Sequence, residues 1–269
     1  MTILVAGATG NVGRHVVSHL AEAGHKVRAL TRNPSGASVP VGVQAVAGDL
    51  TDPASLARAM DGVSALHLIT FGGEGYAPLE TGAALISLAE RSGVRKVTVL
   101  RGQPGSDVEN AVTASDLEWT LVTPMEFMSG VFDWAESIRT EGVVRAPFAD
   151  ARSPMVHDGD IGAVIAKVLT SDGHAGQSYE LTGPAALSVR DKVSQIAAGL
   201  GRPIVYEEMT EEQARAAWAA EGLPNEVIEF FVMAHGTDHG RVLQTVVDIT
   251  GRPARPLADF VREHADRFQ

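Results

Sequence analysis

Three glycines near the N-terminus have the spacing of a ligand-binding turn. They stand at Gly7, Gly10 and Gly13, between an apolar run at residues 2–6 and a segment of helical length at residues 12–23. Glycine allows a tight turn and a close approach of the backbone to a pyrophosphate, whose charge the free N–H groups of a helix start attract. A turn packed only for its own sake is the alternative. The turn predicts a dinucleotide site made by Gly7, Thr9, Gly10, Asn11, Val12 and Gly13.

The residues that follow the expected strand at 26–30 bear on the choice between NADPH and NADH. A carboxylate there would bind the ribose hydroxyls of NAD, but residues 30–33 read Leu-Thr-Arg-Asn and contain no acid. An arginine at this point favours the 2′-phosphate of NADP. We therefore expect NADPH as the cofactor and Arg32 as its contact, with chance placement of an arginine in this loop as the alternative.

Six short motifs spread over most of the chain match one known family. They are residues 5–13 (Val-Ala-Gly-Ala-Thr-Gly-Asn-Val-Gly), 31–34 (Thr-Arg-Asn-Pro), 48–52 (Gly-Asp-Leu-Thr-Asp), 124–128 (Pro-Met-Glu-Phe-Met), 160–161 (Asp-Ile) and 179–184 (Tyr-Glu-Leu-Thr-Gly-Pro). In these motifs the chain resembles the atypical, NmrA-like branch of the short-chain dehydrogenase/reductase superfamily. The first three motifs are the more specific ones.

The resemblance implies further site residues. It places Asp49 and its neighbour Leu50 at the adenine edge, although an Asp before Thr51 also suits a turn cap. Thr70, at the end of the fourth expected strand, would face the ribose or the nicotinamide, or serve only as a strand-end hydroxyl. For the substrate, the resemblance implies contacts from residues that can equally belong to a core, namely Phe71, Glu126, Phe127 and Met128.

The chain lacks the Tyr-x-x-x-Lys pair with which typical members of that superfamily reduce ketones. Its only tyrosines are Tyr76, Tyr179 and Tyr206, and the residues four positions later are glutamate, glycine and threonine. Where the family places the pair, after the fifth expected strand, this chain has Arg101. A guanidinium there can stabilise an oxyanion, and Tyr76, in the loop after the fourth strand, is the best-placed phenol. We take Arg101 and Tyr76 as the candidate catalytic residues.

This loss has two explanations from different classes of function. An NADPH-dependent reductase acting on a quinone or an activated, polycyclic ketone needs little help from a proton donor, because its product anion is delocalised. The alternative is a non-catalytic regulator that senses NADP(H), as known in the NmrA-like branch. A third reading, a sugar-nucleotide epimerase, is disfavoured by the same missing pair.

The elements that must position these residues alternate along the chain. Strands are expected at residues 2–6, 26–30, 43–47, 65–69, 96–100 and 119–122, with helices beginning near residues 53, 78, 106 and 124. This rhythm predicts an α/β fold with a Rossmann doubly wound parallel sheet. We expect a Rossmann domain over residues 1–124. Residues 125–269 are expected to form a smaller, mostly helical substrate lobe interleaved with the last sheet strands, with short strands at 154–157 and 178–181.

Composition narrows the partners. The net charge of −11 opposes association with nucleic acid or anionic lipid, and the chain has no cysteine. No apolar run suits a membrane span or a signal peptide, so we expect a cytoplasmic protein. Histidines at 15, 19, 235 and 239 read as inert rather than as metal ligands. The expected partner is a small aromatic or quinone-like substrate, bound by a monomer or a homodimer.

Overall fold

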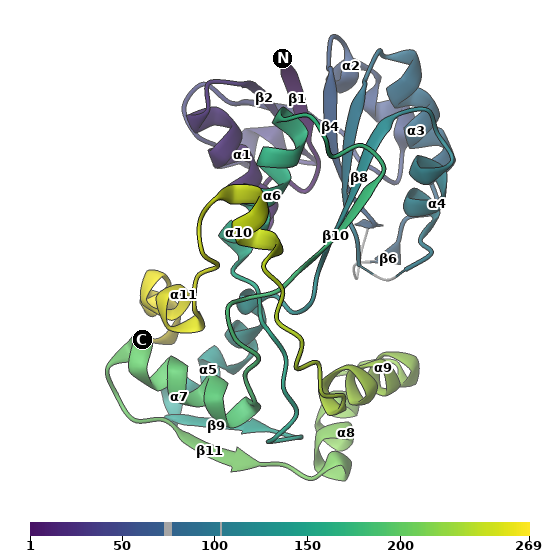
Figure 1. The fold of residues 1–269 in the computed structure, drawn as a ribbon. Helices are drawn as coiled ribbons and strands as arrows, with labels where there is room; N and C mark the ends of the chain where they lie inside the picture. The colour runs from purple at the N-terminus through teal and green to yellow at the C-terminus, as the bar shows by residue number, and fades with distance from the viewer. Residues whose placement is uncertain (73–76, 103) are drawn as a thin grey trace. The chain divides into compact units, whose positions relative to one another are not determined.

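The computed structural model describes residues 1–72, 77–102 and 104–269 and divides the chain into two units (Figure 1). Unit 1 comprises Met1–Pro124, Asp158–Leu181 and Thr245–Arg252. Unit 2 comprises Met125–His157, Thr182–Gln244 and Pro253–Gln269. Two stretches that follow residue 125 therefore belong to unit 1. The assignment of unit 2 to substrate binding stays a prediction.

Unit 1 is built on a parallel sheet. Within the described residues, its seven strands run in the order β10-β8-β7-β4-β1-β2-β3. Their bounds are β1 (Thr2–Val5), β2 (Lys26–Thr31), β3 (Gln44–Ala47), β4 (Ala65–Ile69), β7 (Lys96–Leu100), β8 (Glu118–Pro124) and β10 (Gln177–Leu181). The order reverses between β1 and β4, which is the point where ligands bind in doubly wound sheets. The predicted fold class is confirmed.

Helices cover both faces of this sheet. Figure 1 shows α1 and α6 on one side and α3 and α4 on the other. The helices of unit 1 are α1 (Gly13–Glu22), α2 (Ala57–Met60), α3 (Gly82–Arg91), α4 (Asp107–Thr113), α6 (Asp158–Thr170) and α10 (Thr245–Thr250). A Cβ on Gly162 of α6 would lie 2.6 Å from the Cβ of His15, so the contact between α1 and α6 requires glycine. Apolar side chains of the strands and of α3 and α4 form one buried cluster on the face of the sheet that α3 and α4 cover.

Unit 2 is mostly helical. Its helices are α5 (Ala135–Thr140), α7 (Val189–Leu200), α8 (Glu211–Ala220), α9 (Asn225–Gly236) and α11 (Leu257–Glu263). A capping box starts α7, where Ser188 and Asp191 satisfy each other's backbone N–H groups, and Thr210 with Gln213 does the same for α8. Phe260, Phe268 and Ile138 are completely buried in the core of this unit.

Two local predictions differ from the structure. The strand expected at 154–157 does not form, because the segment pairs only through the single bridge of Val156 with Phe127. Instead, β9 (Val143–Ala146) pairs in parallel with β11 (Val205–Glu208). The helix expected to begin near residue 124 begins later, as a 3-10 helix over Met128–Trp134 that leads into α5, since Pro124 is the last residue of β8.

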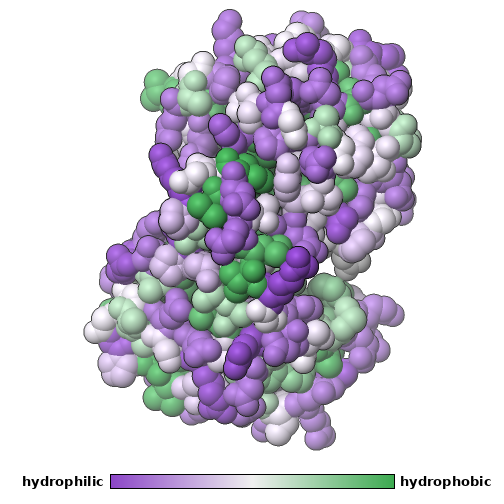
Figure 2. Space-filling model, viewed as in Figure 1, coloured by the Kyte–Doolittle hydropathy of each residue, from purple (hydrophilic) through white to green (hydrophobic). Residues whose placement is uncertain are grey.

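The surface and the helices carry two further observations. Hydrophilic residues cover most of the face drawn in Figure 2. In the part of the chain that the structure describes, no helix is both long enough and apolar enough to span a bilayer.

Candidate functional site

The glycine turn follows β1 and leads directly into α1. Gly7 has a φ of 60°, and its carbonyl accepts a hydrogen bond from the Gly10 N–H at 2.9 Å. A Cβ on Gly13 would lie 2.0 Å from the Gly7 oxygen, so Gly13 is needed to close the turn itself. The same atom on Gly10 would lie 3.2 Å from that oxygen, and Gly10 is exposed. Gly13 thus serves the fold, while Gly10 leaves the backbone open to a ligand.

The start of α1 suits a pyrophosphate. Val12 at its N-cap makes no side-chain hydrogen bond to the helix, and no acidic residue lies in the first turn. The first N–H groups of a helix have no intrahelical partner and attract anions. Thr9, Gly10 and Asn11 are exposed beside them, whereas Val12 is buried. These residues fit the phosphates of a dinucleotide.

Arg32 and Asp49 lie at the ends of neighbouring strands. Arg32 is exposed and directly follows β2, whose Thr31 pairs with Ala47 of β3. The Asp49 carboxylate accepts hydrogen bonds from the Thr51 N–H at 2.9 Å and the Thr51 hydroxyl at 2.8 Å. These bonds and, more weakly, the charge of Arg32 hold the pKa of Asp49 below its usual value. The structure therefore gives Asp49 the role of a turn cap, and its contact with adenine stays a prediction.

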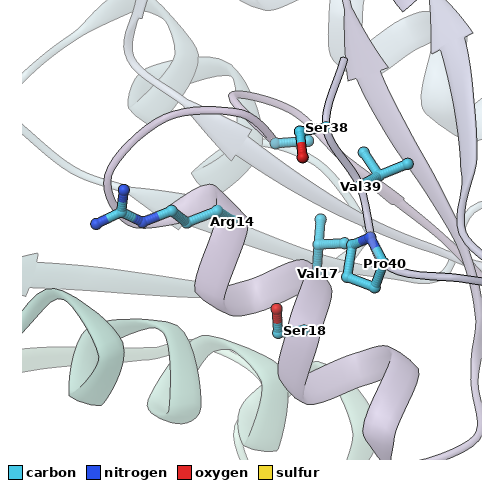
Figure 3. A pocket seen from close by; sticks show the side chains of 7 residues that line it. Arg14, Val17, Ser18, Ser38, Val39 and Pro40 are labelled. Atoms are coloured by element: carbon cyan, nitrogen blue, oxygen red, sulfur yellow. The ribbon is translucent and has the colours of Figure 1, made fainter. Parts of the chain in front are cut away.

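A pocket of about 290 Å³ lies between the first turns of α1 and the segment 38–40 (Figure 3). Val17 of α1 faces Pro40 across it, and Arg14 and Ser38 add polar groups. Neither Arg14 nor Ser38 is among the residues predicted from sequence. A cation in the first turn of a helix opposes the helix dipole and is unexpected there. Arg14 could therefore have been identified from the sequence.

The ends of β4 and β7 are joined by Thr70. Its side chain is 1% exposed, and its hydroxyl accepts the Gly102 N–H at 3.2 Å. The Phe71 ring lies so close that a Cβ on Gly102 would be 2.4 Å from its Cε1 atom. Leu50 is buried, and its carbonyl accepts a hydrogen bond from Thr81 at 2.7 Å. Thr70 and Phe71 thus lie together, and their predicted ligand contacts are untested.

Arg101 directly follows the last residue of β7. Its N–H bonds to the Val122 carbonyl at 2.8 Å, and its Nη1 lies 3.0 Å from Oε1 of Glu109. The other oxygen of Glu109 accepts the Gly105 N–H at 2.8 Å. The Arg101 Nε is buried and has no hydrogen-bond partner among the described residues. The second catalytic candidate, Tyr76, lies outside the described residues.

The three predicted substrate residues of unit 2 have different surroundings. Met128 is 1% exposed and belongs to the core. Phe127 is half-buried and pairs with Val156. Glu126 forms an ion pair with Lys192, whose Nζ lies 2.8 Å from its carboxylate. Lys192 could have been found from sequence, because a lysine interrupts the apolar face that Val189, Val193 and Ile196 give α7.

A metal centre has no support in the part of the protein that is described. Over residues 1–72, 77–102 and 104–269, no group of three or more histidine, aspartate and glutamate side chains is placed to hold a metal ion.

Comparisons with known proteins agree with this geometry. The NAD(P)H-binding family matches residues 7–172. A (4-alkanoyl-5-oxo-2,5-dihydrofuran-3-yl)methyl phosphate reductase of Streptomyces griseus is 38% identical, covering 99% of this chain and 99% of the relative. An NAD(P)H azoreductase of Xenophilus azovorans is 35% identical, with 99% of each chain covered. The solved structure of an NADPH-dependent quinone oxidoreductase of Escherichia coli, in complex with NADPH, superposes with a TM-score of 0.80 at 24% identity, covering 98% of this chain and 100% of that one.

These matches confirm the predicted nicotinamide cofactor and the predicted resemblance. The family match begins at Gly7, the first residue of the turn, and ends at Asp172, so it spans the strands whose ends carry Arg32, Asp49, Thr70 and Arg101. The chain belongs to the NAD(P)H-binding family and is an NAD(P)H-dependent oxidoreductase.

Proposed function

We propose that this protein is an NADPH-dependent reductase of conjugated acceptors, either quinones or activated, polycyclic ketones. The observation that carries the proposal is the ion pair of Arg101, directly after β7, with Glu109 of α4, in a chain without a Tyr-x-x-x-Lys pair. The relatives support it, because a quinone, an azo group and an oxo-dihydrofuran carrying an alkanoyl group are all conjugated electron acceptors.

The proton requirement separates these acceptors from simple ketones. Bound NADPH supplies a hydride. An aliphatic ketone then becomes an alkoxide, a strong base that needs a well-placed acid, whereas a conjugated acceptor becomes a delocalised and weakly basic anion. Water or a substrate hydroxyl suffices as the proton source for the second kind of anion. For a reductase, the absence of a Tyr-x-x-x-Lys pair therefore favours acceptors of the second kind.

Arg101 has a donor to spare for such an anion. Glu109 takes one Nη group, which orients the guanidinium, and the buried Nε lacks a partner among the described residues. The Nε itself is shielded from solvent, so an anion would meet the accessible part of the guanidinium, in a side chain that is 19% exposed. In this proposal Arg101 stabilises the oxyanion of the reduced acceptor.

The preference for NADPH rests on two arginines. Arg32 is exposed at the end of β2, and Arg14 lines the pocket beside the turn. Arg14 lies in the first turn of α1, where a cation costs about 0.3–1 kcal/mol against the helix dipole unless an anion is bound nearby. The 2′-phosphate of NADPH is such an anion.

The test of this preference is a titration with NADPH and NADH. Loss of one charge-assisted contact costs about 1.5–3 kcal/mol, so Arg32→Ala should weaken NADPH binding by roughly 10-fold to 150-fold and leave NADH binding nearly unchanged. Arg14→Ala should act in the same direction. Arg91→Ala is the matched control, because Arg91 is an exposed arginine of unit 1 whose side chain donates a hydrogen bond to the Ser87 hydroxyl. Equal selectivity in all three variants would refute the assignment.

A second function, the NADP(H)-sensing regulator, differs in one outcome. A sensor would bind NADPH with the same turn and the same arginines but would not oxidise it with any acceptor. Steady-state consumption of NADPH in the presence of a quinone therefore separates the two. Consumption that depends on the quinone concentration supports the reductase, and its complete absence alongside tight binding supports the sensor.

A further inference from the structure

A buried ion pair lies in unit 2, outside the cofactor turn. The Lys192 Nζ lies 3.0 and 2.8 Å from the two carboxylate oxygens of Glu126 and 3.0 Å from the Ser153 hydroxyl oxygen. The Ser153 hydroxyl also donates to Glu126. The ammonium therefore has a partner for each of its protons, and the pair is electrically neutral.

The two ends of the pair differ in their access to ligands. The Lys192 side chain is 7% exposed, whereas that of Glu126 is 28% exposed. Lys192 occupies the buried face of α7, beside Val189 and Val193. Glu126 follows the last residue of β8 by two positions, in the segment expected to contact the acceptor. A ligand reaching this pair from solvent therefore meets the carboxylate first.

The charged and titratable groups near the pair are a histidine, two aspartates and an arginine. Burial lowers the pKa of His235, while Glu126 raises it and Lys192 lowers it, so that ring is neutral near pH 7. Asp133, which raises the pKa of His235, is a carboxylic acid and adds no positive charge. Arg152, the residue before Ser153, is exposed, and its charge adds to the hydrogen bonds of Ser188 in lowering the pKa of Asp191.

We infer that Glu126 determines substrate specificity by neutralising Lys192, so that the acceptor site selects uncharged acceptors over those carrying a carboxylate or a phosphate. This inference rests on the proposed function and on the expectation from sequence that segment 126–128 contacts the acceptor. An anionic substituent beside Glu126 meets like charge, and the ammonium of Lys192 is already paired, in a setting where water screens charges less than in solution. Removing the charge of Glu126 leaves the Lys192 ammonium without its counterion and turns the same place into an anion site.

The experiment uses pairs of acceptors that differ only in a remote charge. One pair is a quinone with a propionate side chain and its methyl ester, and the other is an alkanoyl-oxo-dihydrofuran methyl phosphate and its free alcohol. The measured quantity is the ratio of kcat/KM for the uncharged and the charged member. We expect the wild-type protein to prefer the uncharged member by at least about tenfold. Equal or better use of the charged members by the wild-type protein would overturn the inference without any variant.

Variants then assign the preference to the pair. Glu126→Gln should shift the ratio by about tenfold or more toward the charged member. The double variant Glu126→Gln with Lys192→Met, which has no buried charge, should abolish that shift. Glu207→Gln removes a carboxylate that pairs with Arg145 at 2.8 Å in an exposed place of the same unit, and should leave the ratio unchanged.

Two results would count against the inference in distinguishable ways. Turnover of the uncharged acceptors with the same ratio in Glu126→Gln and the wild-type protein refutes the specificity role alone. No turnover of either member by the wild-type protein refutes the proposed function, and this inference with it. If Glu126→Gln does not fold, the ratio of kcat/KM can still be measured for the wild-type protein and for the double variant, and these two ratios test the inference.

Discussion

His67 gives a stability prediction whose size follows from the structure. It lies on β4, in the middle of the sheet, with 1% of its surface exposed. Its Nδ1 lies 2.8 Å from the Thr98 hydroxyl, and its Nε2 has no hydrogen-bond partner among the described residues. Burial lowers the pKa of His67 from 6.5 to about 3, so the folded protein holds the ring neutral.

The sign and the size of the pH effect follow from that pKa. In the unfolded chain the ring takes up a proton as the pH falls below 6.5, whereas in the folded protein it does so only near 3. The contribution of the neutral His67 ring to the free energy of unfolding is complete above pH 6.5 and is lost as the pH falls toward 3, at about 1.4 kcal/mol per pH unit. Acidification to about pH 5 should therefore cost about 2 kcal/mol of the free energy of unfolding through this residue alone.

Urea unfolding at several pH values tests this. His67→Asn keeps a group able to bond with Thr98 but does not titrate, so its free energy of unfolding should fall less steeply with acid than that of the wild-type protein, by about 2 kcal/mol between neutral pH and about pH 5. His25→Asn, in the loop before β2, is the matched control and should follow the wild-type curve. Parallel curves for His67→Asn and the wild-type protein would refute the reasoning.

Other variants test the turn and the end of β7. Gly13→Ala should destabilise the fold, because its Cβ would lie 2.0 Å from the Gly7 oxygen, whereas Gly10→Val should stay folded and lose NADPH binding. Thermal unfolding and a binding titration separate the two effects. Tight NADPH binding by folded Gly10→Val would contradict the assignment. Arg101→Ala should lower kcat with a quinone by roughly a hundredfold, while a fall in Tm with unchanged kcat would make the pair with Glu109 purely structural. Tyr76→Phe should slow turnover by about tenfold or less in the same assay, and a larger loss would make Tyr76 the main proton donor.

The parts of the molecule that sequence predicts well are those determined by local pattern. Short apolar runs alternating with helical segments place all strands of the sheet in unit 1, and the glycine spacing places the turn between β1 and α1, because both depend on neighbouring residues. The strands β9 and β11 were not predicted. Each has four residues, and their pattern of burial carries little signal.

The candidate site divides in the same way. Residues at strand ends, such as Arg32, follow from the topology of a parallel sheet. The network of Lys192, Glu126 and Ser153 does not, because it joins three segments that are far apart along the chain. The pairing of Arg101 with Glu109 also depends on how the loop before α4 folds back, through the bond of Glu109 to the Gly105 N–H.

The central claim, hydride transfer to a conjugated acceptor, is tested most directly with NADPH deuterated at C4. An acceptor whose conjugated double bond joins two carbons retains the label, since the hydride becomes a carbon-bound hydrogen. We predict that the purified protein consumes one NADPH per acceptor reduced, that deuterium appears on a carbon of the product, and that simple aliphatic ketones are not reduced. NADPH that binds tightly, is not consumed with any quinone or azo compound, and transfers no deuterium to a carbon of an oxo-dihydrofuran would contradict the claim and favour the sensor.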